Sequence, residues 1–552
     1  MGIESSYRRW YVVLIAEGLS IINLIIATEL DAKIREIPYG AGPRFMPEKG
    51  CLPGTRAAFL DFITNWVNDP SSERTLVLFG QAGTGKSSIA HEIAHRFDSM
   101  HRLTSSIIFL RNEQSKPYHL FTTLAHDLSD RYPSFKASLG RIVQGDSSLR
   151  VRTRDYPTLF ESLILKPLDG LRIVGPIFVV IDALDESGDT TGRNGLHAFL
   201  AKNLSRLPSN FRVLITSRPE ESIQSVFDRA TSASIKYMND PQLAAQLDKD
   251  ILSFLQDILP SDEFEKHGVA LAIKAEGLFQ WAAVAGQFIL EPPKCFGFSK
   301  RRCINHLLKL AKDRDREDPL DYLYKEVLEG YFTHPEMRLL FRSVVGQLIA
   351  AFEPLSIRSL IALRGHASND DDDADSVVAM LRSLGSLFSN VNMPDITLPI
   401  IPLHTSFRDF LINKEKSGEF FIELRDAHHG LAHSCLSLML RDLRFNICHI
   451  ESSYLTNKDI KDLEARTAKY LPPSLSYACR FYHDHLKHLD FETDLFHKLR
   501  DFNETKFLFW LEVLSITNNV PLSLPALSFM NVWLASGQSV SFGISSVRPS
   551  DN

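Results

Sequence analysis

Residues 80–87, GQAGTGKS, place three glycines, a lysine and a serine at a spacing suited to binding phosphate. Gly80, Gly83 and Gly85 can adopt backbone conformations closed to residues with a Cβ, so the N–H groups of the loop can converge on one anion. Lys86 would add a positive charge beside the β- and γ-phosphates of a nucleotide, and the Ser87 hydroxyl would ligate Mg²⁺. The pattern therefore predicts a Walker A motif, or P-loop, rather than a glycine-rich connector.

The segments on either side of this loop agree with that prediction. Residues 76–79 are an apolar, strand-like run, and residues 87–97 repeat apolar side chains at helical spacing. A P-loop requires a strand, a turn and a helix in this order. The free N–H groups at the start of the helix would also face the phosphate.

A second apolar run ends in a group of carboxylates. Residues 177–181 are continuously apolar, as in parallel strands that are buried on both faces, and Asp182, Asp185 and Glu186 follow. A carboxylate at this strand end, beside the P-loop, would hold Mg²⁺, usually through water, and a second acid would orient the attacking water. The pairing with a P-loop favours nucleotide hydrolysis over an acidic turn that only caps a strand.

A third strand is predicted within residues 211–220 and ends in Thr216, Ser217 and Arg218, before Pro219. Ligands of parallel sheets bind beyond the carboxyl ends of the strands, so these polar groups would face the γ-phosphate. Arg218 is a candidate sensor of the nucleotide, and a surface arginine is the alternative.

Two further strands, residues 105–110 and 233–238, bring the predicted total to five. Helical patterns separate the five strands. We therefore expect an α/β fold: a parallel five-stranded P-loop NTPase sheet with helices on both faces and right-handed crossovers.

Composition limits the classes of function. A chain of 552 residues is too long for one core, and its net charge of −6 argues against a nucleic-acid partner. Six scattered cysteines without C-x-x-C spacing are typical of a reduced, cytoplasmic protein. Residues 8–28 leave open a membrane contact or a buried helix, and the interruptions at Glu17 and Asn23 favour the helix.

With these motifs, the chain resembles NACHT-domain proteins, within the signal-transduction (STAND) class of P-loop NTPases, and most of all the fungal kind linked to heterokaryon incompatibility. The resemblance covers about residues 45–520. It is carried by CLPGTR at 51–56, GQAGTGKSS at 80–88, VVIDALDES at 179–187, LITSRPE at 214–220 and LHTSFRDFL at 403–411.

The resemblance implies ATP or ADP with Mg²⁺ as cofactors, weak hydrolysis in the service of signalling, and protein partners or self-association on activation. No guanine-reading Asn-Lys-x-Asp motif is present, and adenine follows mainly from the resemblance.

It also assigns roles to residues of this chain. Asp182 becomes the Mg²⁺-associated acid together with Ser87, Asp185 and Glu186 the hydrolytic pair, and Arg218 the sensor. Candidate nucleotide-binding residues are Thr55, Arg56, Gly80, Gln81, Ala82, Gly83, Thr84, Gly85, Lys86, Ser87, Ser88, Arg218 and His404. For His404, a contact to bound ADP and a buried core histidine are equally favoured. Where relatives have Gly-x-Pro near the adenine, this chain has Gly277-Leu278-Phe279, which puts that contact in doubt.

Beyond the NTPase core we expect helical domains. Ser356 would cap the first helix of a winged-helix-like domain. Residues 376–388 would form a second helix, and residues 391–404 would form a wing hairpin. Acidic residues at 370–373 would repel DNA, so this domain would pack against protein. The predicted regions are 1–45, an apolar helix or linker with no recognised effector; 46–240, the NACHT core; 241–335, a helical domain; 336–412, the winged helix; and 413–552, a helical C-terminal region.

The C-terminal region offers little further chemistry. His483, His485 and His488 do not share one helix face, so a helical cap is favoured over a metal site. No propeller or solenoid period, such as WD40 repeats, is found, which suggests a switch core alone, from a short isoform or an incomplete gene product.

Three functions fit these observations. A regulatory NTPase switch is favoured. The alternatives are an ADP-stabilised scaffold without turnover and, less favoured, a small-molecule P-loop kinase, which would need an acceptor pocket and a lid with extra arginines.

Overall fold

The computed structural model describes residues 32–37, 39, 44–109, 119–145, 155–187, 190–230, 232–242, 246–290, 299–309, 318–365, 371–452 and 454–544. The chain divides into two compact units. The first runs to Asp257 and also takes Glu276–Phe279, and the second takes Ile258–Ala275 and everything from Gln280. The apolar segment at residues 8–28 lies outside the described residues. No helix in the described part of the chain is long and apolar enough to cross a bilayer.

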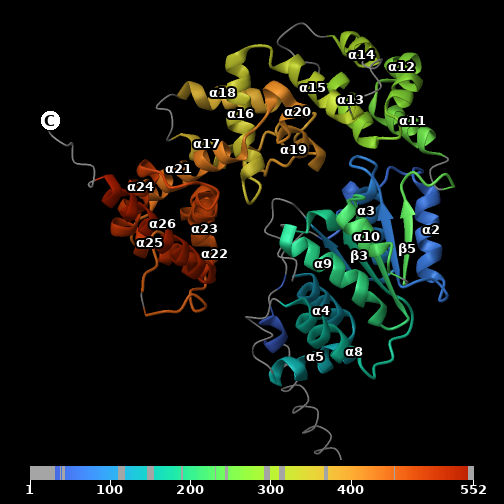
Figure 1. Ribbon diagram of the computed structural model, residues 1–552, viewed down its shortest axis with the longest axis horizontal. Helices are drawn as coiled ribbons and strands as arrows, with labels where there is room; N and C mark the ends of the chain where they lie inside the picture. Colours follow the sequence, from blue (N-terminus) through green and yellow to red (C-terminus); the bar gives the residue numbers. More distant parts are fainter. Residues whose placement is uncertain are drawn as a thin grey trace, which may run out of the picture. The chain divides into compact units, whose positions relative to one another are not determined.

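The first unit is built on the predicted sheet of five parallel strands (Figure 1). Their order is β2-β3-β4-β1-β5. The bounds are Thr75–Phe79 for β1, Leu103–Ile108 for β2, Ile177–Asp182 for β3, Phe211–Ser217 for β4 and Ala233–Tyr237 for β5. The prediction of a parallel five-stranded α/β core is confirmed.

The strand order adds one detail to the expected site. Strand β4 pairs with both β1 and β3, so the strand that ends at Asp182 is not the neighbour of the P-loop strand. In the paired register Phe79 lies opposite Ser217, and Ile181 lies opposite Ile215. The P-loop, Asp182 and the end of β4 therefore still lie along one edge of the sheet.

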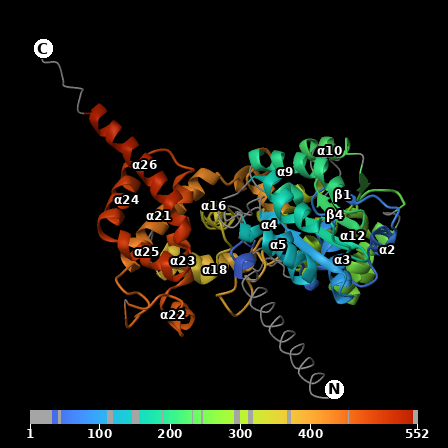
Figure 2. The same cartoon turned by 90° about the horizontal axis from the view of Figure 1, so that it is seen from below.

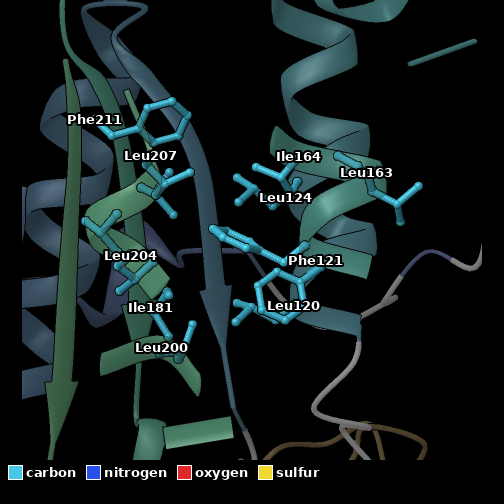
Figure 3. Close-up of a cluster of buried hydrophobic side chains, with 14 of the residues drawn as sticks. Leu120, Phe121, Leu124, Leu163, Ile164, Ile181, Leu200, Leu204, Leu207 and Phe211 are labelled. Atoms are coloured by element: carbon cyan, nitrogen blue, oxygen red, sulfur yellow. The ribbon is translucent and has the colours of Figure 1, made fainter. Parts of the chain in front are cut away.

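Helices cover both faces of the sheet because successive strand residues point to opposite sides. On one face α2 (Ala57–Asn68) and α3 (Lys86–Ser99) pack on alternate residues of β1 and β3. On the other face lie α4 (His119–Arg131), α5 (Pro133–Gly145), α7 (Tyr156–Phe160), η2 (Glu161–Leu165) and α9 (Thr190–Asn203). Figure 3 shows Phe121, Leu124 and Ile164 of this layer facing Ile181 of β3. The helices α8 (Lys166–Leu168), α10 (Glu221–Phe227) and most of α11 (Leu247–Ile258) complete the unit.

The described residues of the second unit form helices joined by turns and loops, with isolated β-bridges and no strand. Its longer helices before the C-terminal group are α12 (Ser261–Lys274), α13 (Phe279–Leu290), α14 (Lys300–Lys309), α15 (Pro319–Tyr331), α16 (Pro335–Ala350), α17 (Ile357–Arg364), α18 (Asp371–Ser383) and α19 (Thr405–Leu411). The C-terminal group is α21 (Leu424–Asp442), α22 (Leu463–Tyr470), α23 (Pro473–Leu486), α24 (Thr493–Thr505), α25 (Phe507–Ile516) and α26 (Ser523–Ile544). Within it α21 packs against both α23 and α24 (Figures 1 and 2).

The region predicted as a winged helix contains the expected cap but no regular wing. The Ser356 hydroxyl accepts the Ser359 N–H at 3.1 Å and caps α17, as predicted. The next helix begins at Asp371, before the predicted residue 376. Pro399 bridges to Ser356, and Pro402 bridges to Phe388. Proline has no N–H to continue a ladder, so residues 391–404 pair with earlier segments instead of forming a hairpin. The winged-helix assignment stays a prediction.

Candidate nucleotide-binding site

The P-loop has the backbone that its glycines predict. Gly83 and Gly85 have φ values of 78° and 88°, in the left-handed region, and α3 starts at Lys86. Gly80 packs closely against Met238, and a Cβ at Gly80 would lie 2.5 Å from Met238 Cγ. The loop can therefore curl tightly while its N–H groups and the start of α3 point to one place.

Lys86 reaches back across this loop. Its Nζ donates hydrogen bonds to the carbonyl oxygens of Gly80, at 2.8 Å, and Gln81, at 3.0 Å. Burial lowers the pKa of Lys86 to about 8, although the charges of Asp185 and Asp182 favour the protonated form. A phosphate bound in the loop would also favour the protonated form of Lys86, so phosphate binding and protonation of Lys86 are coupled.

Asp182 is fixed by the strand that separates it from the P-loop. The Thr216 hydroxyl, on β4, donates a short hydrogen bond to Asp182 Oδ1 and accepts the Ala183 N–H at 3.0 Å. Ala183 has a φ of 57°, which is costly for a residue with a Cβ, and its bond to Thr216 supports that turn. Thr216 was predicted to face the γ-phosphate. In the structure its hydroxyl positions the carboxylate expected to serve Mg²⁺, and the contact with the γ-phosphate stays a prediction.

Asp185, Glu186 and Arg218 are brought together at the ends of β3 and β4. Arg218 Nε lies 3.2 Å from Asp185 Oδ2, and its Nη2 lies 3.9 Å from Glu186 Oε1. The Arg218 N–H also donates to Asp185 Oδ1 at 3.0 Å. Both acids lie in the short helix η3 (Leu184–Glu186) and are buried, and the Arg218 side chain is only 18% exposed. Arg218 is therefore not a surface arginine, and its role as a sensor stays a prediction.

The segment with the candidate nucleotide-binding residues Thr55 and Arg56 is hydrogen-bonded to the P-loop. Arg56 is buried at the start of α2, with a φ of 59°, and its guanidinium donates a short hydrogen bond to the Thr84 carbonyl. The same guanidinium lies over the Phe279 ring, 4.6 Å from the ring centroid, and the Arg56 N–H donates to Asp250 Oδ2 at 2.9 Å. Burial lowers the pKa of Arg56 to about 10.

Asp250 and Phe279 were not predicted as site residues. Phe279 stands at the position where relatives have proline, so the departure in the Gly-x-Pro element was the available signal. Asp250 had none. Thr55 is buried beside Arg56, and its hydroxyl donates to the Leu52 carbonyl at 2.7 Å.

The other predicted phosphate-binding residues lie in the turn or at the start of α3. They are Gln81, Ala82, Thr84, Ser87 and Ser88. Thr84 donates its hydroxyl to the Gln81 carbonyl at 2.8 Å, which closes the loop, and the exposed Ser87 stands in the first turn of α3. The Ser87 hydroxyl and the Asp182 carboxylate are oxygen donors, the type that Mg²⁺ prefers. The residues present therefore fit a magnesium–nucleotide complex.

His404 belongs to the second unit and caps a helix there. Its Nδ1 accepts the Ser406 N–H at 3.1 Å, at the start of α19, and lies 2.6 Å from the Ser406 hydroxyl. The Ser406 hydroxyl is 2.9 Å from the hydroxyl of the buried Tyr324. His404 is half-buried, and its predicted contact with ADP stays a prediction.

The C-terminal histidines pack as core residues. His485 is fully buried, with Nε2 2.8 Å from the Tyr477 hydroxyl and Nδ1 2.9 Å from Nδ1 of His428. Both of its ring nitrogens therefore have partners. Burial lowers the pKa of His428 to about 4 and holds the pKa of His485 well below its usual value.

The parallel sheet and the residues along its carboxyl edge define a P-loop NTPase. Residues 54–218 match the family model of the nephrocystin 3 N-terminal domain. Over 398 residues, 67% of this chain, the sequence is 24% identical to vegetative incompatibility protein HET-E-1 of Podospora anserina. These matches confirm the predicted resemblance to NACHT-related P-loop NTPases of the STAND class.

The chain spans about a quarter of the length of HET-E-1, since the match covers 27% of that protein. Among solved structures, it is similar to a STAND ATPase with a tetratricopeptide repeat sensor from Pyrococcus horikoshii. That similarity has a TM-score of 0.36 and 14% identity, and it covers 92% of this chain and 67% of the other.

Proposed function

We propose that this protein is a nucleotide-dependent signalling switch. It binds ATP or ADP with Mg²⁺, hydrolyses ATP slowly, and thereby controls protein-partner binding or self-association. The observation that carries this proposal is the ion-paired group of Arg218, Asp185 and Glu186, which lies at the same edge of the sheet as a complete P-loop.

In this proposal each group at that edge has one task. The P-loop and Lys86 bind the β- and γ-phosphates, while Ser87 and Asp182 hold Mg²⁺, which would neutralise the phosphate charge. Glu186 and Asp185 orient the attacking water. Arg218 responds to the γ-phosphate, because a phosphate oxygen competes with the two carboxylates for the same guanidinium. The protein thus distinguishes ATP from ADP by rearranging ion pairs that it already contains.

Arg56 supplies the path by which the nucleotide acts on the rest of the chain. It contacts the P-loop at Thr84 and stacks on Phe279, the first residue of α13. Phe279 belongs to the first unit, and α13 continues into the second. A nucleotide that moves Arg56 would therefore act on a helix shared by both units. A ligand shifts such an equilibrium only by its different affinity for the two states.

The similarity to a vegetative incompatibility protein supports a signalling output through protein partners or self-association, in the cytoplasm. Buried thiols agree with a reducing compartment: Cys435, Cys448 and Cys479 are buried and unpaired.

The test uses the purified full chain. We would identify any co-purifying nucleotide and measure ATP turnover in the wild type, Lys86→Ala and Glu186→Gln, with the exposed Glu221→Gln as the matched control. Bound ADP and slow turnover that is lost in Glu186→Gln but kept in Glu221→Gln would support the switch. Bound ADP without turnover in any protein would favour the scaffold, and turnover that requires a small acceptor would favour a kinase.

A further inference from the structure

Helix α21 carries two histidines on one face, opposite two carboxylates at the start of α24. His429 and His433 are four residues apart, so their side chains are neighbours on the helix, and their ring centroids are 5.1 Å apart. His429 Nε2 lies 2.7 Å from Glu492 Oε2, and His433 Nε2 lies 3.1 Å from Asp494 Oδ2. Glu492 immediately precedes α24 and Asp494 stands in its first turn.

We propose that His429, His433 and Glu492 bind a zinc ion, with Asp494 beside them as a fourth ligand that can exchange with water. The ligand atoms of His429, His433 and Glu492 all lie within 4.8 Å of one another. Ligands about 2.0–2.2 Å from a tetrahedral zinc are about 3.3–3.6 Å apart, so small side-chain movements complete the site. All three side chains are partly exposed, which allows those movements and gives the metal access from solvent.

The donor set selects the kind of metal. Two imidazoles and a carboxylate are ligands between hard and soft in character. They suit Zn²⁺ better than Mg²⁺ or Ca²⁺, which prefer oxygen ligands alone. Two histidines at positions i and i+4 of one helix are also a recurring arrangement for zinc. All residues of the proposed site belong to the second unit, and none of them is a candidate nucleotide ligand.

Lys498 makes a specific prediction about this site. Its Nζ lies 2.9 Å from His433 Nδ1 and 2.9 Å from the Ser437 hydroxyl. An ammonium group can only donate, so it holds His433 with its proton on Nε2, directed at Asp494. Zinc would bind His433 at Nε2 and displace the Nε2 proton to solvent. A neutral imidazole that binds zinc through Nε2 carries its one ring proton on Nδ1, taken up from solvent. Lys498 must therefore turn to Ser437 alone when zinc binds, and it competes with the metal.

Zinc at this position would act as a clamp. It would fix the first turn of α24 to α21, and α21 also packs against α16, α17 and α23. Zinc binding would therefore stabilise the arrangement of the C-terminal helices without taking part in nucleotide chemistry.

The test is a zinc titration of the chelator-treated full chain against a chromophoric zinc chelator, with Mg²⁺ in excess to occupy the nucleotide site. The wild type is compared with His429→Gln, His433→Gln and Lys498→Met. His497→Gln, at an exposed histidine on α24, controls for non-specific binding among the 19 histidines. Loss of an outer-shell partner costs about 10–100-fold in metal affinity, so we expect loss of a ligand to cost at least about tenfold. Lys498→Met should bind more tightly than the wild type, and His497→Gln equally.

Equal zinc affinity and stoichiometry in the wild type, His429→Gln and His433→Gln would overturn the proposal. Hydrogen exchange of the wild type with and without zinc provides a test that needs no variant. The amides at the start of α24 should be protected by zinc, and unchanged exchange there would also contradict the site.

Discussion

Replacing Thr216 by valine removes the hydroxyl that joins Asp182 to the turn after β3. Thr216 is fully buried, and its hydroxyl serves two partners, Asp182 Oδ1 and the Ala183 N–H. A hydrogen bond to a charged group contributes about 1.5–3 kcal/mol, and a partly buried N–H left without its partner costs about 1 kcal/mol more. We therefore expect Thr216→Val to destabilise the sheet by about 2–4 kcal/mol and to weaken Mg²⁺–nucleotide binding.

The same sheet supplies a matched control. Thr75, on the neighbouring strand β1, is also buried, but its hydroxyl has no hydrogen-bond partner among the described residues. Thr75→Val removes an unsatisfied polar atom without removing a bond, so its stability should be unchanged or higher by about 1 kcal/mol.

Hydrogen exchange of the β3 and β4 amides is the appropriate assay, because a chain with two units need not unfold in one step. A loss of about 2–4 kcal/mol corresponds to a fall in protection of about 30- to 800-fold. Equal protection in Thr216→Val and the wild type would refute the reasoning, as would an equal loss of protection in Thr75→Val.

Three further predictions concern charge and packing. Burial lowers the pKa of Lys86 to about 8 and bound phosphate favours its charged form, so ADP affinity measured by calorimetry should fall as the pH rises above about 8. This fall should be absent in Lys86→Met. Gly80→Ala should abolish nucleotide binding, because its Cβ would meet Met238, and the added change Met238→Ala should partly restore binding in the same assay. Burial lowers the pKa of His428 from 6.5 to about 4, so as the pH falls the unfolded chain is protonated at His428 before the folded chain is. The denaturant stability of the second unit should therefore fall as the pH falls from about 6.5 towards 4, and an unchanged midpoint would contradict this.

Most of the NTPase core could be predicted because its signals are local. The glycine spacing at 80–85, the apolar runs before Gly80 and Asp182, and the acids after residue 181 each depend on a few consecutive residues. The strand order could not be read from such runs, since nothing in the run before Asp182 says which strand pairs with it. The position of β4, and with it the role of Thr216, required the three-dimensional structure.

The same reasoning explains what was missed around Arg56. Its partners Asp250 and Phe279 are about 200 residues away in sequence, and no spacing rule joins them to the segment before the P-loop. The prediction of a wing hairpin at residues 391–404 overlooked that Pro399 and Pro402 cannot donate to a strand ladder. In the C-terminal region the sequence drew attention to His485, which is fully buried. The histidines that meet carboxylates, His429 and His433, depend on a contact between two helices.

The most direct test of the switch is hydrogen exchange of full-length Glu186→Gln, which should bind ATP without hydrolysing it, in Mg²⁺–ATP and in Mg²⁺–ADP. We predict that the two nucleotides give different exchange in α13 and in the turn at His404, in addition to the P-loop. Identical exchange in the second unit with both nucleotides, while the P-loop is protected by each, would show that nucleotide binds without switching the chain.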